Sequence, residues 1–129
     1  MKGGLDSDRD SFFDQFTTQF YSVGDELKVS EQQRQDTIAL CQQSDQRAAL
    51  GCMEAFATTD FRADLPAITV PTLVIHGDGD GVVPFKGSGA RTHTAIPQSE
   101  LVVLAGAPHG CNVSHAAQFN EALVSFLAK

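Results

Sequence analysis

Two polar loops of the sequence contain side chains that could carry acid–base chemistry. Asp78 and Asp80 follow the apolar run that ends at Gly77, and His109 lies in the segment Gly106-Ala107-Pro108-His109-Gly110. An aspartate that accepts a hydrogen bond from an imidazole holds it in one tautomer and stabilises its cation, which supplies two-thirds of a nucleophilic triad. The same residues are also compatible with a plain turn-forming aspartate and an ordinary loop histidine.

These loops follow two segments with the composition of buried strands. Residues 70–77 form a β-branched run bounded by Pro and Gly, and residues 100–105 form a second apolar run after Pro97. Short continuous apolar runs are typical of strands covered on both faces of a parallel sheet. Ligands bind beyond the carboxyl ends of such strands. We therefore expect residues 76–80 and 108–111 to be neighbours in space.

Helical patterns alternate with these strands. Residues 86–95 predict a weak helix, and residues 114–127 predict a last helix that buries four apolar side chains, Phe119, Leu123, Phe126 and Leu127. The order strand, helix, strand, helix predicts a parallel α/β unit in residues 65–129.

Residues 1–64 predict helices throughout. Four phenylalanines recur at helical spacing and predict a helix over residues 9–21. Ser30 and Gln33 have the spacing of a capping box, which begins a second helix. A third helix is expected after Asp45, with a buried face that comprises Ala48, Ala49, Cys52, Met53 and Phe56.

Length and composition limit the possible functions. The 129 residues suffice for one compact domain, and a formal net charge of −7 argues against a nucleic-acid partner. No apolar run is long enough to cross a bilayer, so no membrane partner is expected. The N-terminus lacks the apolar core of a secretory signal, and the three cysteines cannot all pair within one chain. These features favour a reduced, cytoplasmic protein.

Four motifs occur in a characteristic order and spacing: Phe61-Arg62-Ala63-Asp64-Leu65, Pro71-Thr72-Leu73-Val74-Ile75-His76-Gly77-Asp78-Gly79-Asp80, Val83-Pro84 and Gly106-Ala107-Pro108-His109-Gly110. Together they resemble the C-terminal part of the α/β-hydrolases called non-haem haloperoxidases or perhydrolase-type esterases. Residues 1–60 also look like the helical cap of that family. The resemblance implies a truncated α/β-hydrolase fold, with a helical cap-like segment over residues 1–64 and a C-terminal α/β unit of the hydrolase core over residues 65–129, together forming one compact domain.

The resemblance also assigns roles to the candidate side chains. It implies that Asp80 is the triad acid, His109 the triad base and Asp78 a loop-shaping acid. Members of the family carry the nucleophilic Ser in a G-x-S-x-G elbow on an earlier strand. No G-x-S-x-G occurs in these 129 residues, and Gly87-Ser88-Gly89 lacks the spacing. We therefore expect the chain to be nearly inert as a serine hydrolase by itself, and we expect no haem, metal or other cofactor.

Two functions remain open for such a chain. In the first, it is part of an esterase or perhydrolase-type hydrolase and supplies Asp80 and His109 to a Ser from a complementing N-terminal half, with a small ester as substrate. In the second, it is a non-catalytic oligomeric remnant or interaction module. Two parallel strands alone would expose an edge, so we expect a homo-oligomer or the complementing half to cover it.

Other residues near His109 suggest alternative chemistry. His109, Cys111 and His115 could be considered as metal ligands, but their spacing fits no common zinc pattern. Cys111 could be a thiolate beside an imidazolium, or a small side chain that fills the loop.

Overall fold

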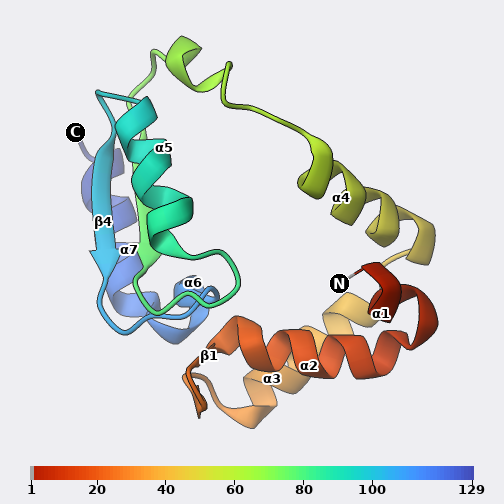
Figure 1. Cartoon of the computed structure of the whole chain (residues 1–129). Coiled ribbons are helices and arrows are strands. Elements are labelled where there is room, and N and C mark those ends of the chain that lie inside the picture. The colour runs from red at the N-terminus through yellow and green to blue at the C-terminus, as the bar shows by residue number, and fades with distance from the viewer. Residues whose placement is uncertain (1) are drawn as a thin grey trace.

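The computed structural model describes residues 2–129, which form a helical region and an α/β unit joined by residues 59–72 (Figure 1). The helical region contains α1 (Lys2–Ser7), α2 (Arg9–Tyr21), the hairpin strands β1 (Ser22–Val23) and β2 (Glu26–Leu27), α3 (Glu31–Gln42) and α4 (Gln46–Thr58). The α/β unit contains β3 (Leu73–Gly77), α5 (Gly89–Ala95), β4 (Glu100–Leu104), α6 (Cys111–Ser114) and α7 (Ala116–Leu127), with short 3-10 turns at η1 (Leu65–Ala67) and η2 (Phe85–Gly87). Within residues 2–129, no helix combines the length and hydropathy that a membrane crossing requires.

Helices α2, α3 and α4 each begin at a side-chain cap. The carboxylates of Asp8 and Asp45 each accept a hydrogen bond from the amide three residues further on, at 3.1 and 2.8 Å, at the starts of α2 and α4. Ser30 and Gln33 form both hydrogen bonds of the capping box at the start of α3. Such bonds satisfy amides that have no partner within the helix. The three predicted helices are therefore confirmed.

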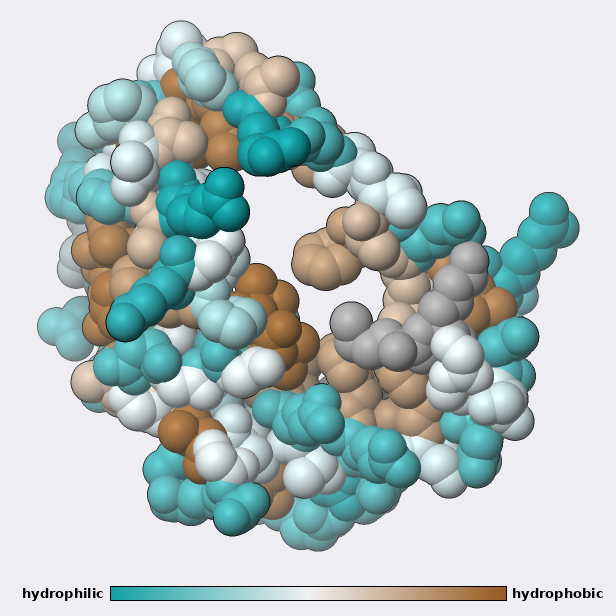
Figure 2. Space-filling model, viewed as in Figure 1, coloured by the Kyte–Doolittle hydropathy of each residue, from teal (hydrophilic) through white to brown (hydrophobic). Residues whose placement is uncertain are grey.

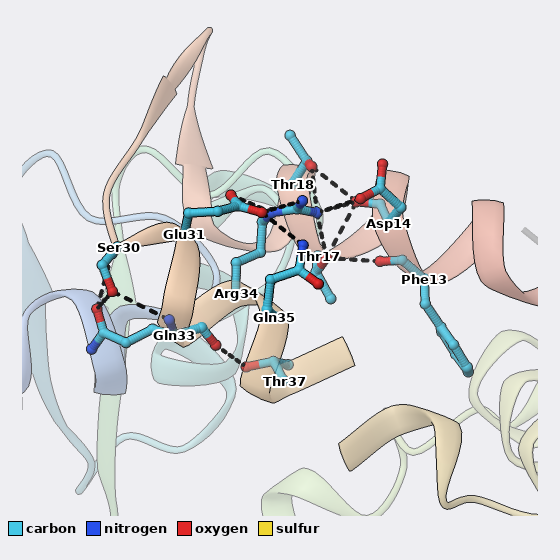
Figure 3. Close-up of polar contacts among 10 residues, drawn as sticks. All are labelled: Phe13, Asp14, Thr17, Thr18, Ser30, Glu31, Gln33, Arg34, Gln35 and Thr37. Carbon is cyan, nitrogen blue, oxygen red and sulfur yellow. Dashed lines mark hydrogen bonds and ion pairs between the residues drawn. The ribbon is translucent and has the colours of Figure 1, made fainter. Parts of the chain in front are cut away.

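A buried arginine joins α2 to α3. The guanidinium of Arg34 donates to Asp14 Oδ1 at 2.8 Å and to Thr17 Oγ1 at 3.2 Å on α2, and to Glu31 Oε1 at 2.7 Å on its own helix (Figure 3). Arg34 is 8 % exposed, so its charge is removed from water and needs these partners. The interaction fixes how the two helices pack, because no hydrocarbon side chain could satisfy the same acceptors.

The sheet of the α/β unit is a parallel pair. β3 and β4 pair in a register that runs from Leu73 opposite Glu100 to Gly77 opposite Leu104. Figure 1 shows α5 in front of the strands and α7 behind them, and the contacts agree: α5 packs on β3, and α7 packs on both strands. The predicted strand, helix, strand, helix unit is confirmed. Its pairing brings the carboxyl ends of both strands to one edge of the sheet.

Two helical faces that were expected to be buried are only partly covered. No residue of α4 is buried, and Phe56 near its end is 74 % exposed. On α7, Phe119 is half-buried against the strands, but Leu123 is exposed and Leu127 is 72 % exposed. The apolar periodicity correctly predicts both helices, but the burial prediction is wrong for Phe56, Leu123 and Leu127, because nothing within residues 2–129 covers these side chains. The partly buried residues of α4, Ala49, Leu50 and Met53, pack against a small core of Leu5, Phe13 and Ile38.

The Glu31–Arg34 pair predicts an acid-dependent loss of stability. Hydrogen bonds from Arg34, and secondarily from Gln35, lower the pKa of the Glu31 carboxyl from its ordinary 4.5 to about 2. A carboxyl whose pKa is lower in the folded state stabilises that state above the unfolded pKa and loses this contribution as pH falls. We expect the melting temperature to decrease between pH 4.5 and pH 2 more steeply in the wild type than in E31Q, measured by circular dichroism. Equal slopes would contradict the assignment.

Candidate active site

The loops that follow β3 and β4 lie against each other. The amide of Asp78 donates to the carbonyl of Leu104 at 3.2 Å, and the amide of Gly79 donates to the carbonyl of Ala107 at 3.0 Å. These bonds extend the parallel pairing beyond the ends of the strands. The predicted proximity of the two polar loops is confirmed.

Asp80 and His109 meet at this edge of the sheet. Asp80 Oδ2 lies 2.7 Å from His109 Nδ1, and the Asp80 side chain is 3 % exposed while that of His109 is 31 % exposed. The other carboxylate oxygen accepts hydrogen bonds from the amides of Val82 at 2.9 Å and Val83 at 2.8 Å. Two backbone donors fix the orientation of this carboxylate. The imidazole is thus held by a buried acid, with its other face partly open.

The helical region supports the imidazole from the opposite side. The ring of Phe20, on α2, meets the His109 ring edge-on at 4.7 Å between centroids, and the amide of Gly110 donates to the Phe20 carbonyl at 2.8 Å. Gly110 has no room for a side chain, because a Cβ there would overlap the ring of Tyr21. Tyr21 is 4 % exposed and its hydroxyl lies 3.0 Å from Thr37 Oγ1, so the ring cannot easily move away.

Asp78 contacts the backbone, whereas Asp80 contacts the imidazole. Asp78 Oδ1 accepts a hydrogen bond from the amide of Gly106 at 2.6 Å, and Gly106 has a φ of +67°. This backbone conformation favours glycine, and the carboxylate holds the turn that follows β4. The geometry supports the loop-shaping part that the resemblance implies for Asp78.

A third polar side chain reaches Asp80 and is absent from the sequence-based prediction. His76 Nε2 lies 3.1 Å from Asp80 Oδ2 and 2.9 Å from the carbonyl oxygen of Val83. The side chain of His76 is 13 % exposed. An ionisable residue inside the apolar run of a strand was the signal that could have identified it.

An apolar cavity of about 690 Å³ opens beside His109. One side of the cavity is lined by His109 and by Val82 and Val83, whose amides bind Asp80. The other side is lined by apolar side chains of the helical region, including Phe12, Phe16, Met53 and Phe56. Figure 2 shows the molecule hollowed between its two parts, with hydrophobic residues mainly along the lower side of the hollow. The site therefore combines an acid–base pair with a wall that would favour apolar groups.

His109 has no hydrogen-bonded hydroxyl or thiol within the described part of the chain. Among residues 2–129, no Ser, Thr or Cys side chain forms a hydrogen bond with His109. Burial, together with the nearby Asp80 carboxylate, raises the pKa of the Cys111 thiol. This favours the neutral thiol, so the geometry supports the reading of Cys111 as a loop filler. No group of three His, Cys, Asp or Glu side chains within the described range could hold a metal ion.

Comparison with known proteins places this geometry in a family. A family model described as the alpha/beta hydrolase fold matches residues 9–116. The chain belongs to the α/β-hydrolase fold family. A putative non-heme chloroperoxidase of Synechocystis sp. is 37 % identical over 98 % of the chain, which covers 46 % of that protein.

Solved structures of this α/β-hydrolase type match the chain closely. The crystal structure of a bromoperoxidase from Bacillus anthracis superposes with a TM-score of 0.96 at 45 % identity, covering 99 % of this chain and 47 % of that one. An esterase from Exiguobacterium antarcticum gives a TM-score of 0.90 at 29 % identity and is covered to 46 %. The expected resemblance and fold class are confirmed, and the chain spans about half the length of these relatives.

The close approach of α2 to the His109 loop can be tested with a pair of glycine variants. G110A places a methyl group against the fixed Tyr21 ring, whereas G81A meets nothing within 4 Å. Overpacking of this kind destabilises by about 1–3 kcal/mol, so we expect a lower melting temperature and altered His109 ring signals in NMR spectra for G110A alone. Indistinguishable behaviour of the two variants would argue against a tight contact.

Proposed function

We propose that this chain supplies the acid and the base of a serine ester hydrolase and is active only when a Ser-bearing half completes the site. The observation that carries the proposal is the 2.7 Å contact between His109 Nδ1 and the buried Asp80 carboxylate. That contact leaves Nε2, the other ring nitrogen, free to exchange a proton with a hydroxyl group. No G-x-S-x-G elbow occurs in the sequence, so the nucleophile must come from another segment.

The reaction proceeds in two acyl-transfer steps. His109 Nε2 takes the proton of the Ser hydroxyl as its oxygen attacks the ester carbonyl, and then donates that proton to the leaving alcohol oxygen. Asp80 remains ionised and stabilises the imidazolium. In the second step His109 takes a proton from water, whose oxygen attacks the acyl-enzyme carbonyl. His109 then returns that proton to the Ser oxygen as the acyl–oxygen bond breaks and the carboxylic acid leaves. Hydrogen peroxide in place of water would release a peracid instead, a side reaction that needs no metal.

The substrate is proposed to be a small ester with an apolar acyl or alcohol group. The cavity beside His109 is lined mainly by carbon atoms of phenylalanine, methionine and alanine side chains. Transfer of apolar surface from water into such a wall is favourable by roughly 25 cal/mol per Å². The chain also carries a net charge of −7, most of it in residues 1–64, which disfavours strongly anionic esters.

The partner is proposed to be an N-terminal α/β-hydrolase half that carries the Ser elbow. Relatives are about twice as long as this chain, and the exposed apolar faces of α4 and α7 indicate surfaces that another segment would cover. A second copy of this chain could cover those faces but would bring no G-x-S-x-G elbow. The complementing half therefore explains both the exposed surface and the missing nucleophile.

Activity measurements separate catalysis from a merely inherited geometry. We expect the isolated chain to hydrolyse p-nitrophenyl acetate no faster than H109A or D80N. After refolding with an N-terminal hydrolase half that carries the elbow, we expect activity to appear, and to fall by on the order of 10³–10⁴-fold in either variant. D25N, at an exposed position of the hairpin, is the matched control and should retain the activity. Complemented activity that survives both site variants would refute the proposal.

A second candidate function is a self-associating, non-catalytic module. The exposed side chains of Phe56, Leu123 and Leu127 favour it, because large exposed apolar residues often mark an interface. In that case light scattering of the isolated chain should give the mass of a dimer or larger assembly, and F56S with L127S should reduce it to a monomer. A folded monomer in dilute solution would exclude this function.

A further inference from the structure

His76 contacts the Asp80 carboxylate and belongs neither to the predicted pair nor to the residues that line the cavity. Its Nε2 lies 3.1 Å from Asp80 Oδ2, the same oxygen that receives His109. We propose that His76 is a positioning residue, which holds the loop and the carboxylate of Asp80 in the orientation that His109 requires. This inference rests on the proposed function, since it concerns the same acid–base pair.

His76 binds the backbone of the loop that follows β3. Its ring Nε2 lies 2.9 Å from the carbonyl oxygen of Val83, while the amide of Val83 donates to Asp80 Oδ1 at 2.8 Å. Both polar groups of Val83 are therefore engaged, one by the end of β3 and one by the acid. A shift of the Val83 backbone would move the donors that orient the carboxylate.

The contact with the Val83 carbonyl oxygen requires one tautomer of the His76 ring. A carbonyl oxygen can only accept, so His76 Nε2 must carry the proton. The same nitrogen lies 3.1 Å from Asp80 Oδ2, so a donor also faces this carboxylate oxygen. Because this N–H is directed at Val83, the carboxylate oxygen remains available for the shorter bond to His109.

The neighbours of the His76 ring leave it little room to turn away from Asp80. A Cβ at Gly89 would lie 2.6 Å from His76 Nδ1, so the start of α5 packs directly on the imidazole, and the ring of Phe85 lies 5.5 Å away between centroids. The side chain is also 13 % exposed. A ring confined by these two neighbours keeps its N–H group in one place, which is what a positioning residue requires.

Three substitutions distinguish the N–H group from the bulk of the ring. In H76Q the amide nitrogen is as many bonds from Cβ as Nε2 is, so it can replace the donor to Val83. H76L fills space but donates nothing, and H76N ends one bond short of the acceptor. The readout is the proton on His109 Nδ1 in NMR spectra of the full chain, assigned by its disappearance in H109Q.

We expect this proton to exchange slowly with water in the wild type and in H76Q, and at least about tenfold faster in H76L and H76N. Circular dichroism identifies any variant that fails to fold, and the other of H76L and H76N then decides. Slow exchange in either of these variants, when folded, would show that His76 only packs and would overturn the proposal. Fast exchange in folded H76Q would overturn it as well.

Kinetics of the complemented hydrolase provide a second readout. Misplacement of the acid should lower kcat by on the order of 10–100-fold in H76L with little change in KM, and H76Q should recover most of the loss. The NMR measurement needs no nucleophile, so it remains decisive if complementation yields no activity. A failure of the proposed function is thereby distinguished from a failure of this inference.

Discussion

A buried carboxylate must be surrounded by donors, and this requirement organises the structure around Asp80. Its side chain is 3 % exposed, and its two oxygens are contacted by two backbone amides, by His109 and by His76. These partners come from β3, from the loop after it and from the loop after β4. An unpaired charge in such a position would be strongly destabilising. The parallel pairing of two short strands is thus coupled to the completion of one polar site.

The helical region contributes to this site through its fit against the His109 loop. The contacts of Phe20 and Tyr21 with the loop depend on the absence of a side chain at Gly110. Within the helical region, Arg34 links α2 to α3. The position of the aromatic end of α2 therefore depends on an ion-pair network as well as on apolar packing. The same helices form the apolar wall of the cavity, so one arrangement both supports the base and shapes the space beside it.

Sequence patterns predicted the elements better than their burial. Caps such as Ser30 with Gln33, and apolar runs such as 70–77, act locally, and the corresponding helices and strands are present. The run yields a shorter strand, β3, which begins at Leu73 after Pro71. The burial of Phe56 and Leu127 was mispredicted because burial depends on what packs against a helix, and no segment within residues 2–129 covers these side chains. The helix α1 and the hairpin at Gly24 carry too little periodicity to be read from the sequence.

The pair Asp80 and His109 could be predicted as neighbours because parallel strands place their carboxyl ends together. His76 could not, since its contact with Asp80 depends on how the loop of residues 78–84 folds back on β3. The central claim is that His109 of this chain activates a Ser held by another segment. It is tested most directly by a serine-directed fluorophosphonate label, followed by mass spectrometry of this chain mixed with an elbow-bearing half. The account predicts label on the elbow Ser of the mixture and almost none with H109A. Labelling that is independent of His109, or equally strong labelling of the isolated chain, would contradict it.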